Sequence, residues 1–328
     1  GGGAADPRGG RGAVAADLDG DGADELVVFN DFGLPQVYRS SAAAFVNDTA
    51  RSGVGGVTHA LGGSVADFDG DGRPDLLVST FDRRWAASAA LGDAAPRSLI
   101  DAEAFWMGED GSALLRSQLY RGRGDGTFEE VWERFAPAVY TGAAWNGTFV
   151  DLDNDGWQDI VLASGFHPDA LFFHADRKVV WRWDPAAGRF ADASAGSGLD
   201  FPDSSRAALF ADADGDGDLD ALVLGYSGPR LFRNDSPARR WVGVRLEGAR
   251  SAREARGAAV RVACGGREQA FPYGAFGGGF ASSFAGSLHV GLGGCAGPVR
   301  LSVRWPSGVR QEADLEAGRV NLVRERGP

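Results

Sequence analysis

Four short segments of the sequence concentrate carboxylates at a spacing that suits a metal ion. Each segment reads D-x-D-x-D-G-x-x-[DE], and the four copies start at Asp17, Asp67, Asp151 and Asp212. Calcium takes about six to eight oxygen ligands, and a loop with carboxylates at positions 1, 3 and 5 can curl them around one ion. The glycine at position 6 permits the sharp turn that such a loop requires. The pattern therefore predicts four calcium-binding loops.

The remaining ligands follow from the same loop geometry. Position 7 can offer its backbone carbonyl, which explains why its side chain varies among the copies, and position 9 supplies a last carboxylate. We expect about four bound Ca²⁺ ions, one in each loop. In chain order the predicted ligands are Asp17, Asp19, Asp21, Ala23, Glu25, Asp67, Asp69, Asp71, Arg73, Asp75, Asp151, Asp153, Asp155, Trp157, Asp159, Asp212, Asp214, Asp216, Asp218 and Asp220.

Two other interpretations of the loops predict different structures. An EF-hand needs a bidentate glutamate at position 12 and flanking helices, but position 12 is apolar in every copy, as Val28, Val78, Leu162 and Val223. Aspartate and glycine also form ordinary tight turns without a metal, although four copies with one carboxylate spacing favour the metal site. Because no coordination position is marked as open, we expect the ions to stabilise the scaffold.

Short apolar runs flank each loop on both sides, which predicts a strand–loop–strand hairpin. Successive loops start 50, 84 and 61 residues apart, an interval that suits the four-stranded blades of a β-propeller. The longest interval holds an insertion at about residues 83–116. Carboxylates beside aromatic side chains there suit sugar contact or acid–base chemistry, and an extended hairpin that covers its neighbour is the alternative. The candidate ligand-contact residues are Trp85, Glu103, Trp106 and Asp110.

Charge and cysteine content restrict the possible partners and compartment. The net charge of −12 argues against nucleic acid, whose phosphates need basic clusters, and the apolar runs are too short to span a membrane. Cys264 and Cys295 form a candidate disulfide, with two buried free thiols as the alternative. We expect a secreted or periplasmic protein, although the opening GGGAADPRGG has none of the features of a signal peptide.

The loops and their flanking runs resemble the FG-GAP, or VCBS, repeats of integrin-type β-propellers over about residues 13–235. The segment that follows resembles the ASPIC and UnbV domain, because NDSPARRWVGVRLEG, SLHVGLG and VRWPSG occur in that order. In place of the glutamine that this family usually has before SLHVGLG stand Ser282 and Ser283, so a binding role of that glutamine would be missing here. The residues that fall on the family's pattern are Asn234, Trp241, Leu246, Gly248, Arg253, Gly257, Ala258, Val260, His289, Gly291, Leu292, Gly293, Trp305, Pro306 and Gly308.

The combination resembles the cartilage acidic protein family and its bacterial relatives, which implies a secreted, calcium-loaded propeller with a small β domain behind it. We therefore predict an all-β chain with a calcium-binding FG-GAP β-propeller of four recognisable blades at residues 1–235. An ASPIC/UnbV β domain is predicted at residues 236–328, although its strands could instead complete the ring. We expect the Gly-rich run at residues 274–280 to form a turn in that domain, because no Lys-Ser/Thr follows it as a phosphate loop requires.

Three functions are compatible with these features. The first is an extracellular interaction module, stiffened by calcium, that binds a protein, a glycan or a small molecule. The second is a calcium-dependent, non-redox tailoring enzyme, such as a cyclase or isomerase of natural-product biosynthesis, with its site on the propeller face or at the domain junction. The third is a structural module of a larger surface protein. The sequence leaves open whether the protein is an enzyme, but the lack of a recognisable nucleophile–base pair favours the first function.

Overall fold

The computed structural model of the protein describes residues 9–31, 33–41, 44–56, 59–80, 116–137, 141–165, 176–237, 239–275, 278–279, 282–283 and 286–327. Within these ranges the regular secondary structure is almost entirely β-strand, with two one-turn helices, α1 (Thr49–Ser52) and α4 (Trp132–Phe135). No helix in the described ranges is long and apolar enough to cross a membrane. The predicted all-β fold is thus confirmed.

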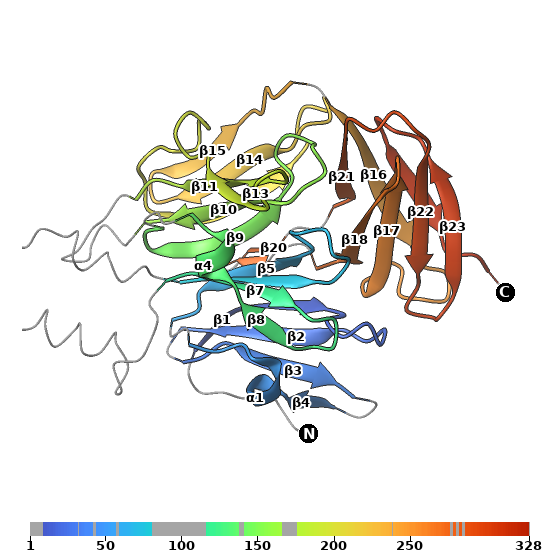
Figure 1. Cartoon of the computed structure of the whole chain (residues 1–328), viewed down its shortest axis with the longest axis horizontal. Coiled ribbons are helices and arrows are strands. Elements are labelled where there is room, and N and C mark those ends of the chain that lie inside the picture. The colour runs from blue at the N-terminus through green and yellow to red at the C-terminus, as the bar shows by residue number, and fades with distance from the viewer. Residues whose placement is uncertain are drawn as a thin grey trace, which may run out of the picture.

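Each Asp-rich loop joins the first two strands of one antiparallel sheet, which we call a blade. Blades 1, 2 and 3 each contain four consecutive strands, and the described part of blade 4 contains three. Figure 1 shows the blades in chain order, from blade 1 at the bottom to blade 4 at the top. The strands are β1 (Gly10–Ala16), β2 (Glu25–Asn30), β3 (Gln36–Ser40) and β4 (Phe45–Asn47) in blade 1; β5 (Gly62–Ala66), β6 (Asp75–Ser79), β7 (Gln118–Gly122) and β8 (Phe128–Glu130) in blade 2; β9 (Ala144–Val150), β10 (Asp159–Ser164), β11 (Val179–Asp184) and β12 (Arg189–Asp192) in blade 3; and β13 (Ser205–Ala211), β14 (Asp220–Gly225) and β15 (Gly228–Phe232) in blade 4.

The strand register places all four loops at the same point of their blades. In blade 1 the last ladder pair before the loop is Ala16 with Glu25, and in blade 2 it is Ala66 with Asp75. The carboxylate at position 9 is therefore the first residue of the second strand, opposite the residue that precedes position 1. This shared register explains why one sequence pattern builds the same loop four times.

Apolar faces of neighbouring blades pack against one another and form three cores. The core between blades 1 and 2 includes Val27, Phe29 and Val78, and blades 3 and 4 share a smaller one around Val161 and Phe210. The core between blades 2 and 3 is rich in aromatic side chains, which meet at ring-centroid distances of about 5–6 Å. These side chains are Phe68, Trp132, Phe135, Phe149, Trp181, Trp183 and Phe190. The tryptophans of this region thus serve inter-blade packing.

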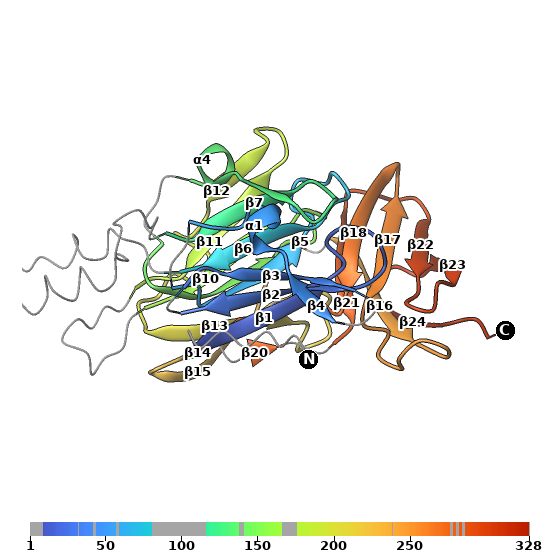
Figure 2. The same cartoon turned by 90° about the horizontal axis from the view of Figure 1, so that it is seen from below.

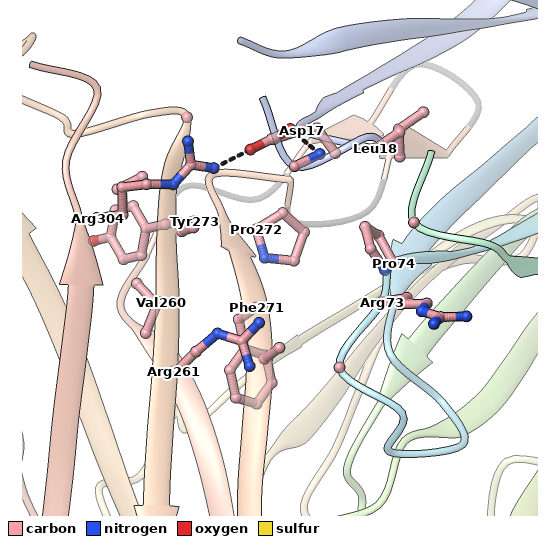
Figure 3. Close-up of a pocket in the computed structure, with 18 of the residues that line it drawn as sticks. Asp17, Leu18, Arg73, Pro74, Val260, Arg261, Phe271, Pro272, Tyr273 and Arg304 are labelled. Carbon is pink, nitrogen blue, oxygen red and sulfur yellow. Dashed lines mark hydrogen bonds and ion pairs between the residues drawn. The ribbon is translucent and has the colours of Figure 1, made fainter. Parts of the chain in front are cut away.

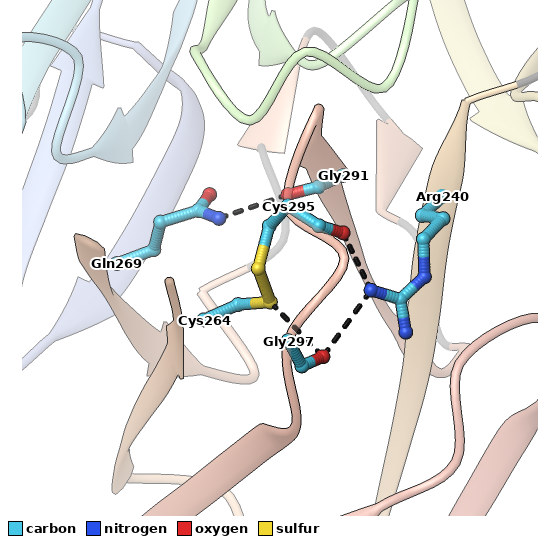
Figure 4. The surroundings of a disulfide bond; sticks show 6 residues. All are labelled: Arg240, Cys264, Gln269, Gly291, Cys295 and Gly297. Atoms are coloured by element: carbon cyan, nitrogen blue, oxygen red, sulfur yellow. Dashed lines mark hydrogen bonds between the residues drawn. A yellow bond between two sulfur atoms is a disulfide. The ribbon is translucent and has the colours of Figure 1, made fainter. Parts of the chain in front are cut away.

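The C-terminal part of the chain forms two further sheets around a core of their own (Figures 1 and 2). One sheet has the order β21-β16-β24 and the other β18-β17-β22-β23. The predicted disulfide between Cys264 and Cys295 is present and joins the end of β17 to the turn that follows β21 (Figure 4). The strands are β16 (Arg240–Glu247), β17 (Ala258–Cys264), β18 (Arg267–Tyr273), β21 (Leu288–Gly293), β22 (Val299–Arg304), β23 (Arg310–Leu315) and β24 (Val320–Arg324).

One C-terminal segment returns to the blades and corrects the prediction of a simple turn at residues 274–280. Two short strands, β19 (Gly278–Gly279) and β20 (Ser282–Ser283), extend the sheet of blade 2 at its β5 edge. Gly278 pairs with Gly63, where an added Cβ would lie 2.1 Å from the carbonyl oxygen of Leu77. The pairing is non-local, so the turn-forming composition of the segment gave no sign of it.

Candidate metal centre

Three carboxylates in each Asp-rich loop converge on one point. In every loop, one oxygen from each of the three side chains lies within 4.8 Å of the other two. The three carboxylates stand at positions 1, 3 and 9 in loop 1, and at positions 1, 3 and 5 in loops 2, 3 and 4. Loop 1 differs because it alone has the longer glutamate at position 9. The groups are Asp17, Asp19 and Glu25; Asp67, Asp69 and Asp71; Asp151, Asp153 and Asp155; and Asp212, Asp214 and Asp216. An all-carboxylate donor set suits a hard divalent cation.

Backbone amides hold these carboxylates in a repeated arrangement. In loop 1 the amide of Gly22 donates to Asp17 at 3.1 Å, and the amide of Asp21 donates to Asp19 at 3.1 Å. The corresponding amides donate to the same positions in loops 2 and 4, and the position-1 contact recurs in loop 3. Each loop is thus preformed by its own backbone, with the carboxylate groups turned inward.

The carboxylate at position 9 has a role that the sequence analysis missed. In blade 2, Asp75 accepts the amide of Phe68 in the loop at 3.0 Å and the amide of Gly122 on β7 at 2.9 Å. Glu25, Asp159 and Asp220 accept the equivalent pairs of amides in their blades. Position 9 therefore ties its loop to the third strand of the blade or to the residues just after it. In the sequence, this role was indicated only by the place of position 9 at the start of a buried strand.

Burial and mutual repulsion raise the pKa values of several loop carboxyl groups. Burial, with the neighbouring carboxylates adding to it, raises the pKa of Glu25 to about 7 and that of Asp151 to about 7. The same causes raise the pKa of Asp67 to about 6. Among described residues, Asp67 Oδ1 and Asp153 Oδ1 are buried and have no hydrogen-bond donor. A cation would satisfy these oxygens and relieve the repulsion, so the residues fit a bound divalent ion.

Arginines already contact several of these carboxylates. Arg121 lies 2.6 Å from Asp69 and 2.9 Å from Asp71, and Arg304 forms an ion pair with Asp17 across the two parts of the molecule. Asp153 pairs with Arg182 and with Arg239. A metal ion bound in these loops would therefore share its carboxylates with the arginines.

Comparison with known families agrees with this geometry. A family model of the FG-GAP-like repeat matches residues 6–78 and 101–162, and a model described as ASPIC and UnbV matches residues 248–327. The protein combines FG-GAP-like repeats with a C-terminal ASPIC and UnbV domain. The predicted architecture is confirmed, although the FG-GAP match ends before the loop of blade 4.

Two further comparisons add little to this assignment. No curated protein matches the chain. One similar solved structure bears a title on specific recognition of non-reducing terminal N-acetylglucosamine by an Agrocybe aegerita lectin; it is 17% identical, with a TM-score of 0.36. The alignment covers 69% of this chain and 50% of that structure, so the chain spans about half the length of the protein it matches.

The ASPIC/UnbV domain contacts loop 3 through residues of its own family pattern. The amide of Gly293 donates to the carbonyl of Asn154 at 2.8 Å, and His289 Nε2 lies 2.6 Å from Asn154 Oδ1. Gly291 has no room for a side chain, because an added Cβ would lie 2.1 Å from Asp151 Oδ2. Arg267 Nη2 donates to the carbonyl of Gly156 at 2.6 Å. The SLHVGLG run therefore packs directly against an Asp-rich loop.

Asn154 is the exception among the four loops at position 4. The other loops have glycine there with φ between 75° and 83°, and Asn154 adopts a similar left-handed φ of 57°. Its side-chain amide donates to the carbonyl of Gly217 and to Asp218 Oδ1 in loop 4, both at 2.9 Å. Asparagine tolerates this backbone region better than most residues. Asparagine has less backbone freedom than glycine at this position, but its side chain forms contacts that join loop 3 to loop 4 and to His289.

The other predicted site residues are placed as follows. Trp157 packs against the core of blades 2 and 3 and under the guanidinium of Arg267, while the Arg73 side chain extends beside Gly124. Their backbone carbonyls, with those of Ala23 and Asp218, stay predicted ligands. The insertion candidates Trp85, Glu103, Trp106 and Asp110 lie outside the described residues.

Proposed function

We propose that the protein is a calcium-stabilised binding module of the extracellular or periplasmic space. The observation that carries the calcium part is the pair of buried, unpartnered oxygens, Asp67 Oδ1 and Asp153 Oδ1, inside converging carboxylate groups. A buried polar atom without a partner costs about 1–3 kcal/mol, and more when it is charged. A bound cation removes this cost, so the loops gain stability from the ion.

Several features support calcium over other metals and a compartment outside the cytosol. The loops offer carboxylate and carbonyl oxygens, which suit calcium, and no nitrogen or sulfur ligand of the kind that favours zinc or copper. The Cys264–Cys295 disulfide is typical of proteins from oxidising compartments. The binding role is supported by the junction between the blades and the ASPIC/UnbV domain, where a cavity of about 710 Å³ lies within the usual range for ligand sites.

Native mass spectrometry of the full chain tests the calcium sites directly. Metal-stripped protein is reloaded with calcium or with magnesium and its bound ions are counted; we expect about four calcium ions and fewer magnesium ions. The double substitution Asp69→Asn with Asp71→Asn should lose one ion. Asp125→Asn with Asp192→Asn makes the same charge change at exposed residues outside the loops and should lose none. A full ion count in the loop variant would refute the ligand assignment.

A further inference from the structure

The cavity at the junction of the two parts of the molecule has two unlike walls. One wall is formed by β17, β18 and β22 of the ASPIC/UnbV domain, and the other by loops 1 and 2 of the blades (Figure 3). Its volume is about 710 Å³. We call it the interdomain cleft. Because both walls are needed, neither part of the molecule could form it alone.

The interdomain cleft is basic although the whole protein is acidic. Five arginines and three aspartates line it, against a net charge of −12 for the chain. Two of the three aspartates, Asp17 and Asp71, belong to the carboxylate positions of loops 1 and 2, so metal ions there would neutralise them. The arginines are Arg73, Arg123, Arg261, Arg304 and Arg310. A cleft of this charge attracts anions, and arginine forks bind carboxylate or sulfate groups in a bidentate manner.

The arginines differ in how far they are engaged within the protein. Arg261 contacts Glu268 at 2.6 Å, but both side chains are about half exposed, so the pair is weak. Neither Arg73 nor Arg310 has an ion pair with any described residue. The guanidinium groups of Arg73, Arg261 and Arg310 can therefore exchange water or a weak partner for a ligand's anionic group at little cost in free energy.

An apolar strip between the arginines defines the shape of the ligand. Pro272 lies on the domain wall, on the same face of its sheet as Arg261 and Arg304, and Pro74 lies on the blade wall (Figure 3). The neighbouring Phe271 points to the other face and packs against the domain core. Flat apolar faces of this kind pack against the C–H faces of sugar rings. Pro272 lies on β18, an edge strand, and its missing N–H interrupts the edge at which an extended peptide could pair. The wall therefore suits a saccharide better than a peptide strand.

Arg304 connects the interdomain cleft with loop 1. Its guanidinium pairs with Asp17 and covers Gly22, where an added Cβ would lie 2.3 Å from Nη1. A divalent ion in loop 1 would take over Asp17 and repel this guanidinium. Arg304 would then be free to contact an anion in the cleft, and by linkage an anion there would strengthen calcium binding.

We propose that the interdomain cleft binds an acidic saccharide, with its carboxylate or sulfate groups on the arginines and a ring face against Pro272 and Pro74, and that calcium in loop 1 strengthens this binding. The ligand class deepens the binding role proposed above. The calcium link rests on the proposed metal sites, whereas the arginine-lined cleft does not.

Calorimetric titration of the full, calcium-loaded protein tests the ligand class. The probes are a hyaluronan tetrasaccharide, which carries carboxylates, a chondroitin sulfate tetrasaccharide, which adds sulfate, and uncharged cellotetraose. We expect both acidic probes to bind and cellotetraose to bind at least about ten-fold more weakly, because charge-assisted hydrogen bonds are lost. Oligoglutamate is titrated as a fourth probe, an acidic peptide. Equal binding of the three saccharides, or binding of oligoglutamate but of no saccharide, would overturn the proposal.

Matched variants locate the binding. Arg261→Gln with Arg310→Gln alters the cleft without touching a predicted metal ligand, and should weaken the acidic probes by about ten-fold or more. Arg253→Gln with Arg319→Gln changes two exposed arginines elsewhere on the same domain and should leave the affinity unchanged. Equal effects of the two pairs would place the probe outside the cleft.

The calcium link is tested separately from the cleft. Affinity is measured with calcium and with chelator for the wild type and for Arg304→Gln, and the ions are counted by native mass spectrometry in the same samples. We expect weaker binding in chelator for the wild type and a smaller calcium dependence for the variant, in which only the neutralisation of Asp17 and Asp71 is left. Wild-type affinity that is the same in both conditions, with the ion count falling as expected, would overturn the link and leave the metal sites standing. Protein that carries no ions even in calcium would refute the metal sites instead.

Discussion

Buried carboxylates are stabilised in opposite ways in the blades and in the ASPIC/UnbV domain. In the loops, Asp67 and Asp151 face other carboxylates, and burial raises their pKa values to about 6 and about 7. In the domain, Glu325 accepts the amides of Ala249, Arg250 and Ser251 at 2.7–2.8 Å, and these bonds lower its pKa to about 2 in spite of burial. An added cation would stabilise the carboxylates of the loops, whereas the domain stabilises Glu325 with its own backbone dipoles.

The largest effect is expected from calcium removal. Each ion that binds the folded state at about 100 times its dissociation constant contributes about 2.7 kcal/mol, so four ions together would dominate the stability of the blades. In excess chelator we expect calorimetry to show the blades unfolding many degrees earlier, ahead of the domain. An unchanged melting curve would show that the loop carboxylates do not depend on a bound cation for their stability.

Loss of the disulfide should lower the stability of the ASPIC/UnbV domain and not that of the blades. Cys264→Ser with Cys295→Ser removes a cross-link within the domain, which typically costs about 2–4 kcal/mol. We expect the domain transition to move down while the calcium-dependent transition of the blades stays in place. Calorimetry with and without calcium separates the two. A variant that loses bound calcium would show that the regions are less independent than their cores suggest.

Asn154 offers a way to break the link between the regions. Asn154→Gly restores the residue of the other loops, keeps the left-handed backbone and removes the contacts to His289, Gly217 and Asp218. The loss of buried hydrogen bonds should cost about 1–3 kcal/mol and separate the domain transition from that of the blades.

The matched control is Gly20→Asn in loop 1. Position 20 has the same left-handed backbone, with φ of 80°, and nothing lies within 4 Å of an added Cβ. This variant should leave both transitions nearly unchanged. If the two variants behave alike, the bridge through Asn154 carries no coupling.

The smallest effect on stability is expected when acid protonates Glu325. Its folded pKa of about 2 lies below the ordinary value of 4.5, so its contribution is fully present above pH 4.5 and is lost as the pH falls toward 2. Glu325→Gln should lower domain stability near neutral pH and flatten its dependence on pH in that acid range. Denaturant titrations of the metal-stripped protein, which remove the contribution of the ions, measure this. A pH profile identical to the wild type would assign the acid sensitivity to other groups.

The sequence predicted the features that depend on neighbours along the chain. Loop spacing, flanking strands and the pairing of Cys264 with Cys295 follow from short-range pattern and composition, and the structure contains all three features. The second role of Asp75 was missed because its partner, Gly122, lies on a strand beyond the insertion. The bridge from Asn154 to His289 was missed for the same reason, since a local pattern carries no information about which distant surface covers a loop.

The pairing of Gly278 with Gly63 has a consequence for how the protein is made. During synthesis, blade 2 emerges from the ribosome long before its partner strand β19, so the β5 edge waits unpaired. An open edge of this kind recruits other chains, and late, long-range contacts slow folding. The β5 edge therefore gains this pair only after the last quarter of the chain has been translated, and removing the ASPIC/UnbV domain would also remove it.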